Sequence, residues 1–137
     1  MKNKVHYGLI AIAIIFFAVG CNKNSSSSAS SFVGNYYGTT TSPGVPAYLD
    51  TFKITSTSNA SQFTIFDTQD SVYFTANVSG NTITSLSGTI PASNGASAVT
   101  FTGQGSLSGN VLTVKAYGAF TYLSQPLTDT LTFIGTK

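Results

Sequence analysis

The sequence predicts an all-β fold: one antiparallel eight-stranded barrel connected up and down, with a β-sandwich as the alternative and an N-terminal signal helix ahead of the domain. From Phe32 onward, no window shows the i, i+3, i+4, i+7 spacing of apolar residues that marks an amphipathic helix. Apolar and polar residues alternate there with period two, as in a sheet with one face in the core. Turn-forming residues divide this part of the chain at short, fairly even intervals.

The N-terminus has the features of a secretory signal. Lys2 and Lys4 precede an apolar stretch over residues 7–19, the order in which the charged and hydrophobic regions of such signals occur. About 20 apolar residues are needed to span a bilayer as a helix, so this stretch is short for a permanent anchor. We therefore expect residues 1–20 to be a cleaved signal peptide.

The residues around the only cysteine predict where the signal ends. Ala18, Val19 and Gly20 directly precede Cys21. The segment resembles the lipobox of bacterial lipoproteins, which implies that Cys21 carries acyl chains such as palmitate and becomes the mature N-terminus. Each buried CH₂ contributes about 0.8 kcal/mol, so several chains hold a protein at a membrane where one chain would not. An ordinary secretory signal with an incidental cysteine and an uncleaved signal anchor are the alternatives.

The segment after the cleavage site is polar and of low complexity. Residues 21–31 begin with the cysteine and are mostly serine, so we expect a flexible linker. Asn22 follows the cysteine, whereas Asp at this place resembles an inner-membrane retention signal of enteric bacteria. We therefore expect a protein anchored by lipid at the outer membrane, on its periplasmic or its surface face.

The domain over residues 32–137 divides into short strands. The clearest alternation runs from Val99 to Leu107. Glycine inside a strand usually marks a bulge or a barrel corner, so we expect bends at Gly103, Gly105 and Gly118, with a narrow interior or space for a ligand as the alternatives. The predicted strands cover residues 33–41, 47–57, 61–67, 71–79, 82–90, 97–108, 111–122 and 127–136.

Turn residues separate these strands. Gly80-Asn81 and Gly109-Asn110 stand in similar surroundings, and both residue types tolerate the positive φ that two-residue hairpin turns require. Prolines with neighbouring Ser, Asn or Gly place loops at residues 43–46, 91–95 and 124–126. Sequential hairpins indicate an up-and-down meander, and closing it removes the edges that invite aggregation.

The start of the domain also carries a family resemblance. Gly34, Asn35 and Tyr36 resemble the Gly-x-Trp opening of the lipocalin-like families, and the domain is similar to small lipoproteins of that type common in Bacteroidetes. This resemblance implies a barrel that either holds one apolar molecule or is filled with side chains.

Charge and composition exclude several functions. After removal of the signal, four lysines balance four aspartates, and the chain has no basic cluster with which to bind nucleic acid. The only histidine, His6, lies in the signal peptide, and Cys21 is expected to be acylated. Triads based on His or Cys and zinc sites are therefore not expected, and we predict no enzyme, no cofactor and no metal.

The four aspartates are the remaining polar candidates. Asp67 and Asp70 offer only two carboxylates to a hard cation, which prefers six or more oxygens, so we expect turn residues that bind nearby backbone amides. Asp50 and Asp129 share the parity of apolar neighbours. An inward carboxylate is costly without a partner, so we expect each to lie at the barrel rim or beside a hydrogen-bonding group. A hydrolase that uses aspartate alone is a third and weaker hypothesis.

Two functions remain open for a monomeric barrel. In the first, interior aromatic residues line a pocket for a small apolar ligand. In the second, the barrel is fully packed and acts as a structural or protein-interaction module of the envelope. A cavity of roughly 300 Å³ or more would favour the ligand. The candidate ligand-binding residues are Tyr36, Phe52, Phe74, Phe101 and Phe133.

Overall fold

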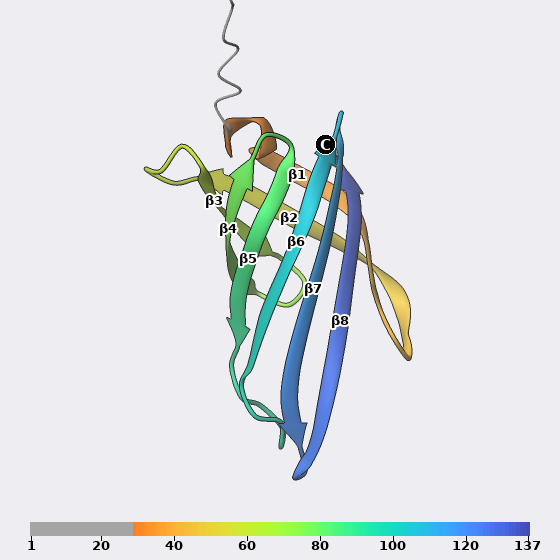
Figure 1. Cartoon of the computed structure of the whole chain (residues 1–137). Helices are drawn as coiled ribbons and strands as arrows, with labels where there is room; N and C mark the ends of the chain where they lie inside the picture. The colour runs from red at the N-terminus through yellow and green to blue at the C-terminus, as the bar shows by residue number, and fades with distance from the viewer. Residues whose placement is uncertain (1–28) are drawn as a thin grey trace, which may run out of the picture.

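Eight strands follow one another along the chain, and each pairs antiparallel with the next (Figure 1). The computed structural model describes residues 29–137. β1 also pairs with β8, from Tyr37–Thr136 to Thr41–Thr132, and this pairing closes the barrel. The predicted up-and-down barrel is confirmed, and the sandwich is not formed. The elements are η1 (Ala29–Phe32), β1 (Gly34–Ser42), β2 (Val45–Ser56), β3 (Gln62–Asp67), β4 (Val72–Ser79), β5 (Thr82–Ile90), β6 (Val99–Ser108), β7 (Val111–Tyr122) and β8 (Gln125–Thr136).

A short 3-10 helix, η1, spans the end of the predicted linker and the first residue of the predicted domain. Ala29 is buried and its N–H donates to the Ala60 carbonyl oxygen at 2.9 Å, so the end of the predicted linker packs against the barrel. The signal peptide, the cleavage-site residues, Cys21 and the linker up to residue 28 lie outside the described residues. No helix within residues 29–137 is long and apolar enough to cross a membrane.

The two Gly-Asn hairpins form as predicted, with one difference in backbone conformation. Their strands pair up to residues that flank a two-residue turn. Gly80 and Gly109 both have φ of 58°, whereas Asn81 and Asn110 do not take positive φ. A single positive φ at the first central residue is the pattern of a type II′ turn, for which glycine is preferred.

Two predicted loops are shorter than expected, because a proline in each lies inside a strand. Residues 43–44 form the first turn, and Pro46 belongs to β2. Leu123 and Ser124 form the last turn with φ of 46° and 66°, and Pro126 belongs to β8. Neither residue type favours positive φ, so the sequence carries no signal for this turn.

Aromatic rings fill the interior against glycines on neighbouring strands. Gly88 pairs with Phe74, and Gly118 pairs with Phe101. A Cβ at Gly88 would lie 2.4 Å from the Phe74 ring, and one at Gly118 would lie 2.8 Å from the Phe101 ring. These glycines therefore leave the volume that the rings occupy. Gly118 marks this close contact rather than the predicted bend.

The irregularity beside Gly103 and Gly105 of β6 lies on the facing strand, β5, and not at the glycines where a bend was predicted. The β5–β6 register shifts between Ile83, which pairs with Gly105, and Leu86, which pairs with Gly103. A Cβ at Gly103 would lie 2.1 Å from the Lys115 carbonyl oxygen. β6 therefore lies too close to β7 for a larger residue at Gly103.

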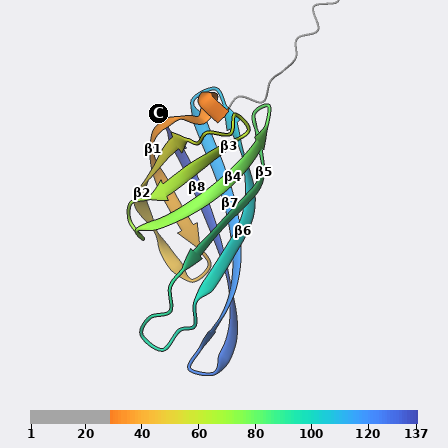
Figure 2. The ribbon, with the colours of Figure 1, turned by 90° about the vertical axis from the view of Figure 1, so that its left-hand side faces the viewer.

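The barrel has two different ends. η1 and the C-terminus lie together at one end, which we call the base (Figure 1). Phe32 is fully buried there, and its ring stacks on Phe63 with centroids 5.0 Å apart. The β1–β2, β5–β6 and β7–β8 connections lie towards the opposite end, which we call the mouth, and the β7–β8 hairpin projects furthest (Figure 2).

Candidate functional site

Polar side chains enter the barrel towards the mouth. The four aspartates of the described residues lie on β2, at the β3–β4 turn and on β8. Within residues 29–137, no lysine forms an ion pair with any of them. This part of the barrel therefore carries negative charge without a neighbouring cation.

Asp50 on β2 and Asp129 on β8 accept hydrogen bonds from hydroxyl groups of β1, the strand that lies between them. Thr40 Oγ1 donates to Asp50 Oδ2 at 2.7 Å, and Ser42 Oγ donates to Asp129 Oδ1. Asp50 is buried and Asp129 is half-buried. The prediction that each inward carboxylate has a structural hydrogen-bonding partner is confirmed.

Asp129 also blocks a free strand edge. β1 pairs with β8 only as far as Thr132, whose carbonyl oxygen faces β1 and accepts from the Thr41 hydroxyl, so β8 has one neighbour before that point. Residues two apart share an edge. Thr130 and Pro126 lie an even number of residues before Thr132, so their backbone groups face the same free edge of β8. Pro126 has no N–H, and the N–H of Thr130 donates to Asp129 Oδ1 at 2.7 Å. Proline and inward charges are known protections against edge-to-edge pairing.

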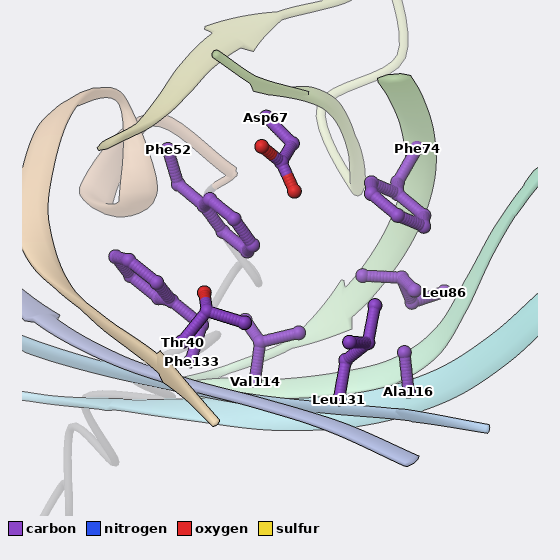
Figure 3. A pocket seen from close by; sticks show the side chains of 9 residues that line it. All are labelled: Thr40, Phe52, Asp67, Phe74, Leu86, Val114, Ala116, Leu131 and Phe133. Atoms are coloured by element: carbon purple, nitrogen blue, oxygen red, sulfur yellow. The ribbon is translucent and has the colours of Figure 1, made fainter. Parts of the chain in front are cut away.

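Asp67 shapes the β3–β4 turn. Its Oδ1 accepts the N–H groups of Gln69 and Asp70, both at 3.0 Å, which confirms its predicted role as a turn residue. Its side chain is only 2% exposed, and the carboxylate points into the barrel between Phe52 and Phe74 (Figure 3). Within residues 29–137, Oδ2 has no hydrogen-bond donor.

Burial and the neighbouring carboxylates raise the pKa of three groups. Burial first, and then the charges of Asp50 and Asp70, raise the pKa of Asp67 to about 7, although its two backbone N–H bonds act in the opposite direction. Burial and the Asp50 charge also raise the pKa of Asp70, while the hydrogen bond from Tyr48 lowers it. Burial and the charges of Asp70, Asp67 and Asp50 raise the pKa of Tyr48 well above its usual range. A proton is therefore retained at Asp67 up to near-neutral pH.

The inner cavity beneath Asp67 is very small. Its volume is about 10 Å³, at the lower limit for a single water molecule. The Phe52 and Phe133 rings stack beside it with centroids 3.9 Å apart. Its lining is mostly apolar (Figure 3). The cavity is lined by Thr40, Phe52, Asp67, Phe74, Leu86, Val114, Ala116, Leu131 and Phe133.

The five candidate ligand-binding residues are all buried core residues. Phe52, Phe74 and Phe133 line the inner cavity, Phe101 faces the mouth, and Tyr36 lies near the base. The structure brings three of them together, but the space between them is far below the roughly 300 Å³ of a ligand pocket.

A larger hollow, the mouth pocket, opens above the inner cavity. Its volume is about 230 Å³. Asp70 and Asp129 contribute carboxylates to it, and the Tyr48 hydroxyl donates to Asp70 Oδ2 at 3.4 Å. The remaining lining is largely apolar. The residues that line the mouth pocket are Ser42, Val45, Tyr48, Asp70, Ile90, Phe101, Asp129 and Leu131.

Sequence reasoning did not find the mouth pocket. It treated Asp70 and Asp129 separately, counted Tyr48 only among the aromatic residues that could line an interior pocket, and assigned no role to Ile90. Strand parity places Leu131 with Asp129 on the inner face of β8, but no sequence signal brings the β3–β4 turn beside that strand. Only the closure of the barrel does so.

No protein-family model matches the chain, and no curated protein is detectably similar to it in sequence. Within residues 29–137, no group of three or more His, Cys, Asp or Glu side chains is arranged to hold a metal ion.

Proposed function

We propose that this chain is a bacterial cell-envelope lipoprotein, anchored at the outer membrane through an acylated Cys21. Its barrel is a non-enzymatic, monomeric module that interacts with another envelope component through its surface. The packed interior carries this proposal, because a cavity of about 10 Å³ leaves no space for a ligand within the barrel.

The position of η1, at which the described part of the chain begins, gives the module an orientation. The chain enters the barrel at the base through η1, so the tether joins at the base (Figure 1). The mouth lies at the opposite end and faces away from the point of attachment. A partner therefore has free access to the mouth while the base is nearest to the membrane.

No specific observation favours the alternative, in which the barrel carries a small apolar ligand. Native mass spectrometry of the protein from its own cells tests it directly. We expect the mass of the lipidated chain alone. A stoichiometric apolar molecule that copurifies with the protein would contradict the packed-module proposal.

Substitution of the cysteine tests the anchor. We expect Cys21→Ser to move the protein out of the membrane fraction, and we expect Ser25→Ala, a change in the adjoining serine segment, to leave it there. Mass analysis of the native N-terminus should show the acyl chains. Full retention of Cys21→Ser with membranes, or an unmodified N-terminus, would overturn the proposal.

Crosslinking in intact cells tests the interaction. A photo-crosslinker placed at exposed Leu127, beside the mouth, should trap one defined envelope protein. The same crosslinker at exposed Asn35, near the base, is the matched control and should not trap it. Equal labelling from both positions would contradict a specific surface at the mouth.

A further inference from the structure

The mouth pocket combines two kinds of surface. Ile90, Phe101 and Leu131 form an apolar floor, and the carboxylates of Asp70 and Asp129 lie in the same hollow of about 230 Å³. Phe101 is buried, whereas Asp70 is exposed at the β3–β4 turn. An occupant therefore needs an apolar stem that rests on the floor and a positive group that reaches a carboxylate.

The charge of this region lacks compensation within the described residues. Lys53 pairs with Asn35 on β1, next to the base, and Lys137 donates to the carbonyl oxygens of Ser31 and Val33 at the base. Lys115 is exposed on the outer face of β7. None of the three lines the mouth pocket. A cationic partner would supply the missing charge.

Asp67 is a second and independent sign of an unfilled polar site. Its carboxylate is almost fully buried, one of its oxygens has no donor within residues 29–137, and it points into the inner cavity. Leu131 lines both that cavity and the mouth pocket, so the two spaces lie on either side of one side chain. The unpartnered carboxyl oxygen of Asp67 therefore lies close behind the apolar floor of the mouth pocket.

The neighbouring strand edge determines how a partner can bind. Pro126 and the occupied N–H of Thr130 leave the free edge of β8 with few donors. An added strand would therefore find few of the N–H donors that drive β-augmentation. A partner can instead be recognised through a side chain that it inserts into the mouth pocket.

We propose that the mouth pocket binds a long basic side chain from an extended segment of a protein partner. The alkyl stem lies on Leu131, Ile90 and Phe101, and the ammonium or guanidinium group lies beside the carboxylates of Asp70 and Asp129. This inference rests on the proposed interaction module and names the chemistry of its partner. Long basic side chains suit such a site because their stems are apolar and only their tips are charged.

The test uses the full chain in a mild non-ionic detergent and a pair of matched peptides. One is a short threonine- and glycine-rich peptide with one central lysine, and the other has norleucine, which keeps the stem but lacks the ammonium group. NMR titration should show shifts of backbone signals around Asp70 and Asp129 with the lysine peptide only. Equal binding of both peptides, or shifts confined to the base, would overturn the proposal.

Charge variants sharpen the test. Asp70→Asn should weaken binding of the lysine peptide about five-fold, equivalent to about 1 kcal/mol. Asn35→Lys changes the net charge by the same amount near the base and should leave binding unchanged. Unaltered affinity of Asp70→Asn, or an equal loss in Asn35→Lys, would contradict a local contact. Because Asp70 is exposed, its substitution leaves the core intact.

Two further outcomes separate the possible sources of the cation. Spermidine that binds as tightly as the lysine peptide would indicate a free polyamine and overturn the protein partner. A chain that traps an envelope protein in cells but ignores the lysine peptide would overturn this inference alone, and the proposed interaction module would stand.

Discussion

The base and the mouth of the barrel are closed by different means. At the base, Phe32 packs on Phe63, and Lys137 Nζ donates to the Ser31 and Val33 carbonyl oxygens at 2.7 and 3.3 Å. The same nitrogen lies 5.4 Å from the centroid of the Tyr36 ring. At the mouth, hydroxyl–carboxylate bonds replace apolar packing. The base therefore contributes stability, whereas the mouth keeps polar groups accessible.

This difference also separates the two kinds of buried polar group. The base contains the Tyr36 hydroxyl, a fully buried group that has no hydrogen-bond partner among residues 29–137. The mouth contains Asp67, which binds two backbone N–H groups but has a strongly raised pKa. Four predictions test whether stability and charge are divided in this way.

The largest effect is expected at the base. Phe32→Ala removes a fully buried ring from its stack on Phe63, so the free energy of unfolding should fall by about 3–5 kcal/mol. Leu49→Ala is the control, because Leu49 is 84% exposed on the part of β2 near the mouth, and its effect should stay within about 0.5 kcal/mol. Urea unfolding measures both. Similar losses would show that the base is not the more stable end.

The second prediction concerns pH. The pKa of Asp67 is higher in the folded than in the unfolded chain, so unfolding releases a proton between about pH 4 and 7. Stability should therefore fall as pH rises through this range, by at most about 1.4 kcal/mol per pH unit. Asp67→Asn should remove most of this slope and stabilise the chain at pH 8, whereas Lys53→Gln should retain it. Urea unfolding at several pH values gives the slope, and a wild-type stability that rises from pH 4 to 7 would contradict the assignment.

A smaller gain is expected from Tyr36→Phe. The substitution removes a buried hydroxyl that lacks a partner among the described residues, so stability should rise by about 1 kcal/mol. Tyr73→Phe removes an exposed hydroxyl and should change little. Thermal unfolding compares the two. A loss of stability in Tyr36→Phe would show that the hydroxyl is satisfied in solution.

The smallest effect is expected from Lys137→Met, which keeps an apolar stem but removes the two hydrogen bonds at the base. Because these bonds are exposed, stability should fall by less than about 1 kcal/mol. Amide exchange of η1 should nevertheless increase, while exchange in the Lys115→Met control stays unchanged there. Unaltered protection of η1 would show that Lys137 does not hold the base closed.

Local sequence determined much of the fold. Period-two alternation gave all eight strands to within two residues, because alternating side chains require one buried and one exposed face. Gly80 and Gly109 determined two turns through their backbone freedom. The short apolar stretch and the residues before Cys21 gave the signal and anchor prediction, which lies outside the described residues.

Tertiary structure decided the rest. Pro46 and Pro126 indicated loops, but strand edges tolerate a residue without an N–H, so both lie within strands. Asp70 and Asp129 are 59 positions apart in the numbering, and only closure of β1 on β8 places them in one pocket. The packed interior likewise depends on which ring faces which glycine, as for Phe101 and Gly118. Such pairings follow from strand register, which single-sequence periodicity does not specify.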